Sequence, residues 1–257
     1  MPSLNRPPSA GALGSRILQC CVAAWVLWAG APAWGSVYLE STRVIYQEGQ
    51  RDVALKLTNA DKAQAALVQL WMDDGGLDAS EVQGHVPFFI NPPMAKIEAG
   101  KSQLARIAFI GEQLDPAHES LYWLNVLEIP PKSTGSSQLS FAIRSRIKFF
   151  YRPKALSALE PFNPEKLQWR WKSKTLPLQI EARNTSAFHW TINTATLLIA
   201  NQEYPLDLSA MLKPQQSLGF SLREADVPLA GPARIRISVI NDYGGESKFE
   251  FEVKDAW

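Results

Sequence analysis

Apolar and polar residues alternate along most of the chain after residue 36. The segment 51–59 reads RDVALKLTN, with Val53, Leu55 and Leu57 at every second position, and the segment 139–151 alternates over its full length. Successive side chains of a strand point to opposite faces, so a period of two indicates β-strands. No stretch keeps apolar residues at helical spacing for three turns. The pattern therefore predicts an all-β protein.

Turn-forming residues separate these alternating segments. Asn91-Pro-Pro and the Asp-Tyr-Gly-Gly run at 242–245 are two such interruptions, and strands with turns every 8–12 residues or so are typical of sandwiches. A longer, proline-bounded interruption covers 152–164. Each half is close to the roughly 100 residues of an immunoglobulin-like sandwich. We therefore expect two immunoglobulin-like β-sandwich domains, at 36–153 and 154–257.

The first 35 residues have the layout of a secretory signal peptide. Arg6 and Arg16 precede an apolar run at 17–30, and small residues follow it up to Ser36. The run is shorter than the roughly 20 residues that span a bilayer. We expect residues 1–35 to be removed, with cleavage before Ser36. Cleavage after Ala33 also fits the small-residue rule.

This segment allows two other interpretations. A lipoprotein site at Cys20 is disfavoured, because the apolar run follows the cysteine instead of preceding it. An uncleaved membrane anchor remains an alternative. Cys20 and Cys21 are the only cysteines, so cleavage leaves a thiol-free protein whose stability in an oxidising compartment depends on its core alone.

Composition and charge exclude several classes of function. The chain has 26 basic and 25 acidic residues, a net charge of +1, and gives no global field that would attract nucleic acid. Its three histidines are scattered along the chain, and we expect no metal site, no cofactor and no small-molecule substrate. No arrangement of residues indicates a catalytic centre, so we expect no enzyme activity.

Two short motifs are better explained without chemistry. Gly100-Lys-Ser resembles the end of a phosphate-binding loop, but Ala95 stands where the first glycine of that loop is required. Asn184-Thr-Ser matches a glycosylation sequon, a pattern with a high chance rate, and it more simply begins a turn.

The alternating segment 139–151 is longer than a typical strand of five or six residues. One interpretation is an inner strand whose apolar face lies in the core. The other is a strand that extends past its own sandwich and offers an apolar edge to a partner, which proteins normally avoid. The pattern alone does not choose between them.

Several motifs then resemble those of PapD-like periplasmic pilus chaperones. These are TRVIY at 42–46, ESLYWLNV at 119–126 with EIPP at 128–131, RIKFFYRP at 146–153, NTSAFHWT at 184–191 and INDYGG at 240–245. They occur in the family's order over essentially all of 36–257. The short stretch between Pro131 and Leu139 is similar to the short-loop branch of that family.

This resemblance implies a binding protein with two immunoglobulin-like domains arranged in an L. Arg43 and Lys148 match the pair that anchors the C-terminal carboxylate of a pilus subunit. Leu139, Phe141 and Ile143 match the alternating apolar residues of the strand lent to the subunit, a mode of recognition known as strand addition. With this role, the long alternation at 139–151 acquires a function.

The resemblance also implies an internal salt-bridge network and a set of partners. Arg106, Glu119 and Arg152 match the network positions near the domain junction. The expected partners are pilus subunits and an outer-membrane usher, and the expected location is the periplasm. Whether the free protein hides its edge by self-association is left open. An Ig-like structural or adhesive module is the alternative, but it has no need of a basic pair beside an apolar edge.

The signal-peptide layout predicts a secreted form that begins near Ser36 and contains no cysteine. N-terminal sequencing and a thiol titration of the exported protein check this expectation. An intact Met1, or a product that stays in the membrane fraction, would contradict it.

Overall fold

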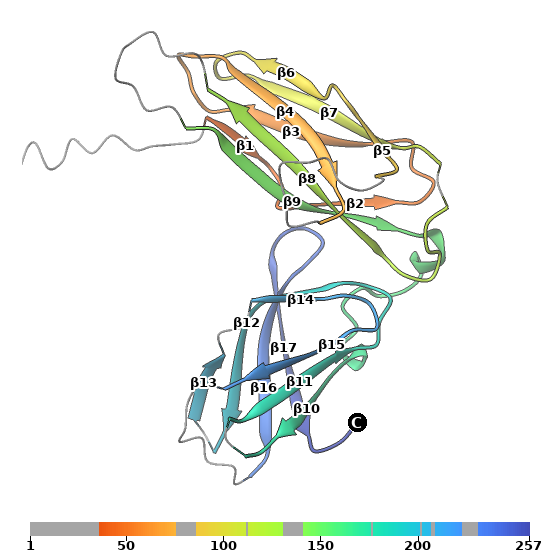
Figure 1. Ribbon diagram of the computed structural model, residues 1–257, viewed down its shortest axis with the longest axis vertical. Coiled ribbons are helices and arrows are strands. Elements are labelled where there is room, and N and C mark those ends of the chain that lie inside the picture. The colour runs from red at the N-terminus through yellow and green to blue at the C-terminus, as the bar shows by residue number, and fades with distance from the viewer. Residues whose placement is uncertain are drawn as a thin grey trace, which may run out of the picture. The chain divides into compact units, whose positions relative to one another are not determined.

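The computed structural model describes residues 36–75, 86–111, 113–130, 141–175, 177–200, 202–206, 209–222 and 231–257. These residues form strands and two single-turn 3-10 helices, which confirms the all-β prediction (Figure 1). Residues 1–35 lie outside the described residues, so the signal peptide stays a prediction.

The first domain is a sandwich of two sheets (Figure 1). The four-stranded sheet has the order β1 (Val37–Leu39), β3 (Val53–Asn59), β7 (Ser102–Phe109), β5 (Phe88–Asn91). The five-stranded sheet has the order β2 (Arg43–Gln47), β9 (Ile143–Arg152), β8 (Ser120–Ile129), β4 (Ala66–Asp73), β6 (Met94–Ile97).

Alternation along these strands builds the core between the two sheets. In β3 the side chains of Leu55 and Leu57 are buried, while those of Ala54 and Lys56 face solvent. The core is rich in aromatic rings, and the Phe88 and Phe149 rings meet edge to face with centroids 4.7 Å apart. Such edge contacts match the positive rim of one ring to the negative face of the other.

The second domain has its own core and a continuous strand path. The path runs β13 (Gln202–Leu206), β12 (Trp190–Ile199), β16 (Ala233–Ile240), β17 (Glu246–Lys254), β10 (Leu167–Ser173), β11 (Gln179–Asn184), β15 (Ser217–Ser221), and β14 (Ala210–Leu212) pairs with β12. The 3-10 turns η1 (Lys154–Leu156) and η2 (Pro164–Lys166) lead into it. Its core contains Trp169, Trp190, Ile192 and Ile235. Two separate cores agree with two domains.

Asn184 is a structural residue. Its side chain is fully buried, its Nδ2 donates to the carbonyl oxygens of Phe188 and Lys213, and its Oδ1 accepts from the backbone N–H of Ser186. An asparagine so enclosed holds a turn and is not available for glycosylation, as the turn interpretation of the motif at 184–186 predicted.

β9 is the strand on which the functional argument depends. It begins at Ile143, so the continuous thirteen-residue strand expected at 139–151 is corrected to ten residues ending at Arg152. Phe141 is described but lies outside β9. The antiparallel neighbour of β9 is β8, and the two strands pair only from Ile143 onward. Residues 131–140 lie outside the described residues, so the short-loop assignment stays a prediction.

Among the described residues, no helix is both long and apolar enough to cross a bilayer. The L-shaped arrangement of the two domains stays a prediction.

Candidate functional site

Arg43 and Lys148 are brought together by the pairing of β2 with β9. The two strands run parallel, and Arg43 lies opposite Lys148 in their register. Side chains at paired positions of neighbouring strands project from the same face of a sheet, about 5 Å apart at their Cβ atoms. Residues 105 positions apart in the chain therefore form a basic pair.

The pair lines a cleft of about 270 Å³. One wall comes from the first domain, with the Trp123 ring 5.9 Å from Lys148 Nζ. The other wall comes from the second domain and includes Thr191, Ile240 and Gly244. Of the described residues that line this cleft, none is acidic.

The second domain holds both cations through neutral oxygen atoms. Arg43 Nη1 donates to the backbone carbonyl oxygen of Ile240 at 2.8 Å, and Lys148 Nζ donates to Thr191 Oγ1 at 3.0 Å. Arg43 Nε is buried and has no hydrogen-bond partner in the part of the chain that is described. The hydrogen-bonding capacity of this guanidinium is thus only partly used, which is unusual for a buried charged group.

The electrostatics of the pair favour an anion. Burial lowers the pKa of Arg43 below its ordinary value. Burial, followed by repulsion from Arg43, lowers the pKa of Lys148 to about 8. Desolvation disfavours the charged form of both groups, and at Arg43 the attraction of Asp242 and Glu119 offsets it only in part. A carboxylate in the cleft would supply that charge and accept hydrogen bonds from both groups.

A second polar cluster lies next to this cleft. Arg152 Nη2 lies 2.8 Å from Glu119 Oε1, and its Nη1 lies 2.7 Å from Asp242 Oδ2. Although burial would lower the pKa of Arg152, these two carboxylates raise it. Glu119 Oε2 also accepts from the backbone N–H of His189 at 3.0 Å and contacts His189 Nδ1 at 2.9 Å.

The sequence reasoning identified Glu119 and Arg152 in this cluster but missed Asp242 and His189. The sequence indicates only a turn at 242–245, and Arg152, the partner of Asp242, is distant in sequence. The available signal was the INDYGG motif itself, in which a carboxylate sits on a rigid turn between β16 and β17. Nothing in the spacing of His189 indicated its contact with Glu119.

Arg106 is not brought to this cluster. It lies on β7, where the neighbouring Ala105 and Ile107 face the core, so its own side chain faces solvent and is 62% exposed. Its Nη1 pairs with Asp52 Oδ1 at 2.7 Å. Its expected place in a network with Glu119 and Arg152 is therefore corrected, and the reason is the alternation of β7.

The three apolar residues expected on the donor strand fall in different places. Phe141 is 69% exposed and Ile143 is 42% exposed, whereas Phe149 on the same strand is in the core. Leu139 lies outside the described residues. Beside Ile143, β2 pairs with β9 only from Lys148 to Arg152, so residues 143–147 of β9 have no strand on that side among the described residues.

Comparison with known proteins gives consistent results. Residues 36–157 match the family described as "Pili and flagellar-assembly chaperone, PapD N-terminal domain", and residues 163–251 match "Pili assembly chaperone PapD, C-terminal domain". The "Chaperone protein FimB/FhaD" of Bordetella pertussis is 34% identical over 231 residues, which cover 87% of this chain and 90% of that protein.

Solved structures are similar as well. The crystal structure of the YadV chaperone has a TM-score of 0.72 and 28% identity, and the match covers 85% of this chain and 100% of that one. The SafB chaperone of Salmonella enterica, solved in complex with the SafA pilin, gives a TM-score of 0.69 over 87% of this chain and 99% of the matched chain. At 24% identity, that second match shows the shared fold alone.

The site's electrostatics make a prediction for the free protein. Lys148 should lose its proton near pH 8, well below an ordinary lysine near 10.4, because it is desolvated beside Arg43. Lysine-selective NMR across pH 6–11 follows this titration. In Arg43→Gln the titration of Lys148 should move to higher pH, because the repulsion from Arg43, one of the two causes of the lowered pKa, is removed. Titration of Lys148 above pH 10 in the unaltered protein would contradict the description of the cleft.

Proposed function

The chain belongs to the PapD family of pili-assembly chaperones, and we propose that it captures a pilus subunit through Arg43, Lys148 and the open edge of β9. The observation that supports this proposal is that Lys148, which pairs with Arg43 of β2, lies on the same strand as the open edge, β9. The family is one of chaperones, not of enzymes. Membership favours this role over an Ig-like structural or adhesive module.

The basic pair would bind the carboxylate at the C-terminus of the subunit. A guanidinium offers a planar fork and an ammonium a point charge, and the two together fix a terminal carboxylate. The partly unsatisfied Arg43 and the lowered pKa of Lys148 support this role, since both describe a cleft that lacks an anion. A chain end held at Lys148 would also set the register of the segment that precedes it.

The open edge of β9 would then pair with the subunit. On the side away from β8, residues 143–147 of β9 pair with no strand among the described residues, and Phe141 and Ile143 are exposed to solvent. Strand addition supplies main-chain hydrogen bonds, while alternate side chains enter pockets of the partner. For a subunit whose sandwich lacks a strand, Leu139, Phe141 and Ile143 would fill the gap in its core.

The cluster around Arg152 would hold the two domains in a fixed relation. Arg152 and Glu119 belong to the first domain, whereas Asp242 and His189 belong to the second. A buried arginine with two carboxylates is costly to disrupt, because removal of one partner leaves an uncompensated buried charge. Since Ile240 and Gly244 line the cleft beside Asp242, this cluster would also position its second wall.

The captured subunits would be delivered to an outer-membrane usher. Membership of the family implies a periplasmic location, and we propose that cleavage of residues 1–35 releases the protein there. SafB, whose fold this chain shares, was solved with a pilin, and a pilus subunit is the corresponding client here.

The carboxylate anchor predicts a difference between two peptides. A peptide with the C-terminal sequence of a subunit should bind as the free acid and weaken by roughly 30-fold or more as the amide, since truncating one member of a desolvated charge contact costs about 2–5 kcal/mol. Arg43→Ala and Lys148→Ala should each weaken the acid to the level of the amide. Isothermal titration calorimetry measures both.

The matched control is Arg106→Ala, which removes an arginine from the same domain outside the cleft and should leave both affinities unchanged. Equal binding of acid and amide would refute the anchor, and hydrophobic strand pairing alone would have to set the register. Melting temperatures of the two cleft variants should change little, because among the described residues each cation has a neutral hydrogen-bond acceptor and no ion pair that the substitution would break.

The open edge predicts that Phe141→Glu and Ile143→Glu abolish subunit capture while the protein stays folded. A carboxylate forced into the apolar gap of the subunit would be buried without a partner, at a cost of several kcal/mol. Pull-down of a subunit measures capture, and circular dichroism measures folding. Phe149→Glu is the contrasting variant, since Phe149 is in the core and its change should unfold the domain. Unfolding of all three variants would show that the first two residues also belong to the core.

A further inference from the structure

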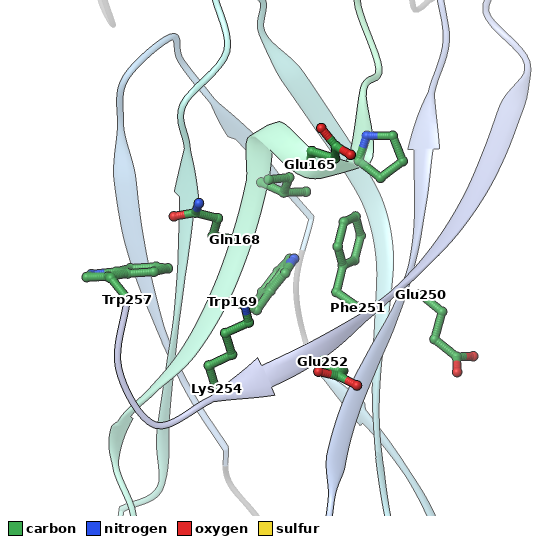
Figure 2. A pocket seen from close by; sticks show the side chains of 10 residues that line it. Glu165, Gln168, Trp169, Glu250, Phe251, Glu252, Lys254 and Trp257 are labelled. Carbon is green, nitrogen blue, oxygen red and sulfur yellow. The ribbon is translucent and has the colours of Figure 1, made fainter.

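A hollow of about 470 Å³ lies in the second domain, and none of the residues proposed above to bind a subunit lines it. It occupies the place where β10 and β17 diverge. These parallel strands pair only at Trp169 with Val253 and at Arg170 with Lys254. Ahead of these positions, the hollow is lined by Leu167 and Gln168 of β10 and by Phe251 and Glu252 of β17. We call it the wedge pocket (Figure 2).

The inner surface of the wedge pocket is apolar and aromatic. Trp169 and Leu167 are buried, and the Trp169 and Phe251 rings lie with their centroids 6.4 Å apart. Figure 2 shows these two rings next to each other, with Glu165 at one end of the pocket. A volume in this range is typical of sites that enclose a side chain or a small ligand.

The rim of the wedge pocket is acidic. Three carboxylates line it, those of Glu165, Glu250 and Glu252, against the single ammonium of Lys254. Glu250 already pairs with Arg234 at 2.6 Å. Among the described residues, neither Glu165 nor Glu252 forms an ion pair. The rim thus has carboxylates available for a positively charged partner.

One wall of the wedge pocket is an open strand edge. β17 pairs with β16 from Glu246 to Glu252, but its opposite edge meets β10 only at Val253 and Lys254. Backbone groups on that edge before Val253 therefore have no strand partner among the described residues. An unpaired edge is a template for an added strand.

Together these features specify one kind of occupant. We propose that the wedge pocket binds an extended peptide segment in which an apolar residue stands between two basic residues. Paired along β17, such a segment would direct its apolar side chain inward beside Phe251, and its flanking cations outward toward Glu250 and Glu252. The period of two along a strand makes these three contacts compatible in one register.

This site is independent of the cleft at Arg43 and Lys148, and its test does not depend on the capture of a pilus subunit. The probe is the capped peptide Ac-Thr-Lys-Phe-Lys-Thr-NH2, which lacks a C-terminal carboxylate. Titration of the ¹⁵N-labelled chain should give saturable shifts at the amides of Phe251 to Lys254 and at the Trp169 indole. The charge-reversed peptide Ac-Thr-Glu-Phe-Glu-Thr-NH2 should give none.

Variants then test the rim. The double variant Glu250→Gln with Glu252→Gln should raise the dissociation constant of the lysine peptide about tenfold, because the two carboxylates that face the lysines lose their charge and keep their shape. Glu246→Gln, on the same strand but outside the pocket, should leave it unchanged. Methylating the backbone nitrogens of the peptide should also weaken binding, because strand pairing needs those donors.

Three results would overturn the proposal. The first is equal binding of the lysine and glutamate peptides. The second is a dissociation constant that does not change in the double variant. The third is a set of shifts that appears along β9 and leaves β17 unchanged, which would place the peptide on the first domain.

Discussion

The short pairing between β2 and β9 is the constraint on which the proposed function depends. β2 covers β9 for five residues, from Arg43 opposite Lys148 to Gln47 opposite Arg152. Where the pairing exists, it places the two cations side by side. Where it stops, the next residues of β9 have an open edge. A longer β2 would close that edge and a shorter one would separate the cations, so one length of strand produces both features.

The buried cluster around Arg152 complements this arrangement. Arg152 is the last residue of β9 in the same five-residue pairing, and it forms an ion pair with Asp242 on the turn that follows β16. On that turn, Gly244 has φ of +81°, and a Cβ there would meet Thr42 Oγ1 at 2.8 Å. Only glycine fits so close an approach. The ion pair and the glycine together bring the second domain's oxygen atoms to the cations of the cleft.

Sequence reasoning predicted the fold well, because a strand with one buried face has apolar residues at every second position, and this alternation is visible in the sequence. It also identified Arg43 and Lys148, through motifs whose order and spacing are specific. It placed Arg106 wrongly, because the side chain of Arg106 faces solvent only as a result of which alternate residues of β7 face the core. It missed Asp242, because a turn residue's long-range partner leaves no periodic trace. The wedge pocket was also beyond sequence reasoning, since it exists only where β10 and β17 diverge.

The lowered pKa of Lys148 links stability and binding in opposite directions. A lysine with a folded-state pKa of about 8 and an unfolded pKa near 10.4 binds more protons when unfolded, so its contribution to stability increases as pH rises between these values. A bound carboxylate favours the protonated form and would raise the pKa again. Affinity therefore falls over the range in which the free protein gains stability. The cleft is least favourable to the fold when it is fully charged, and that is the state in which it binds an anion most strongly.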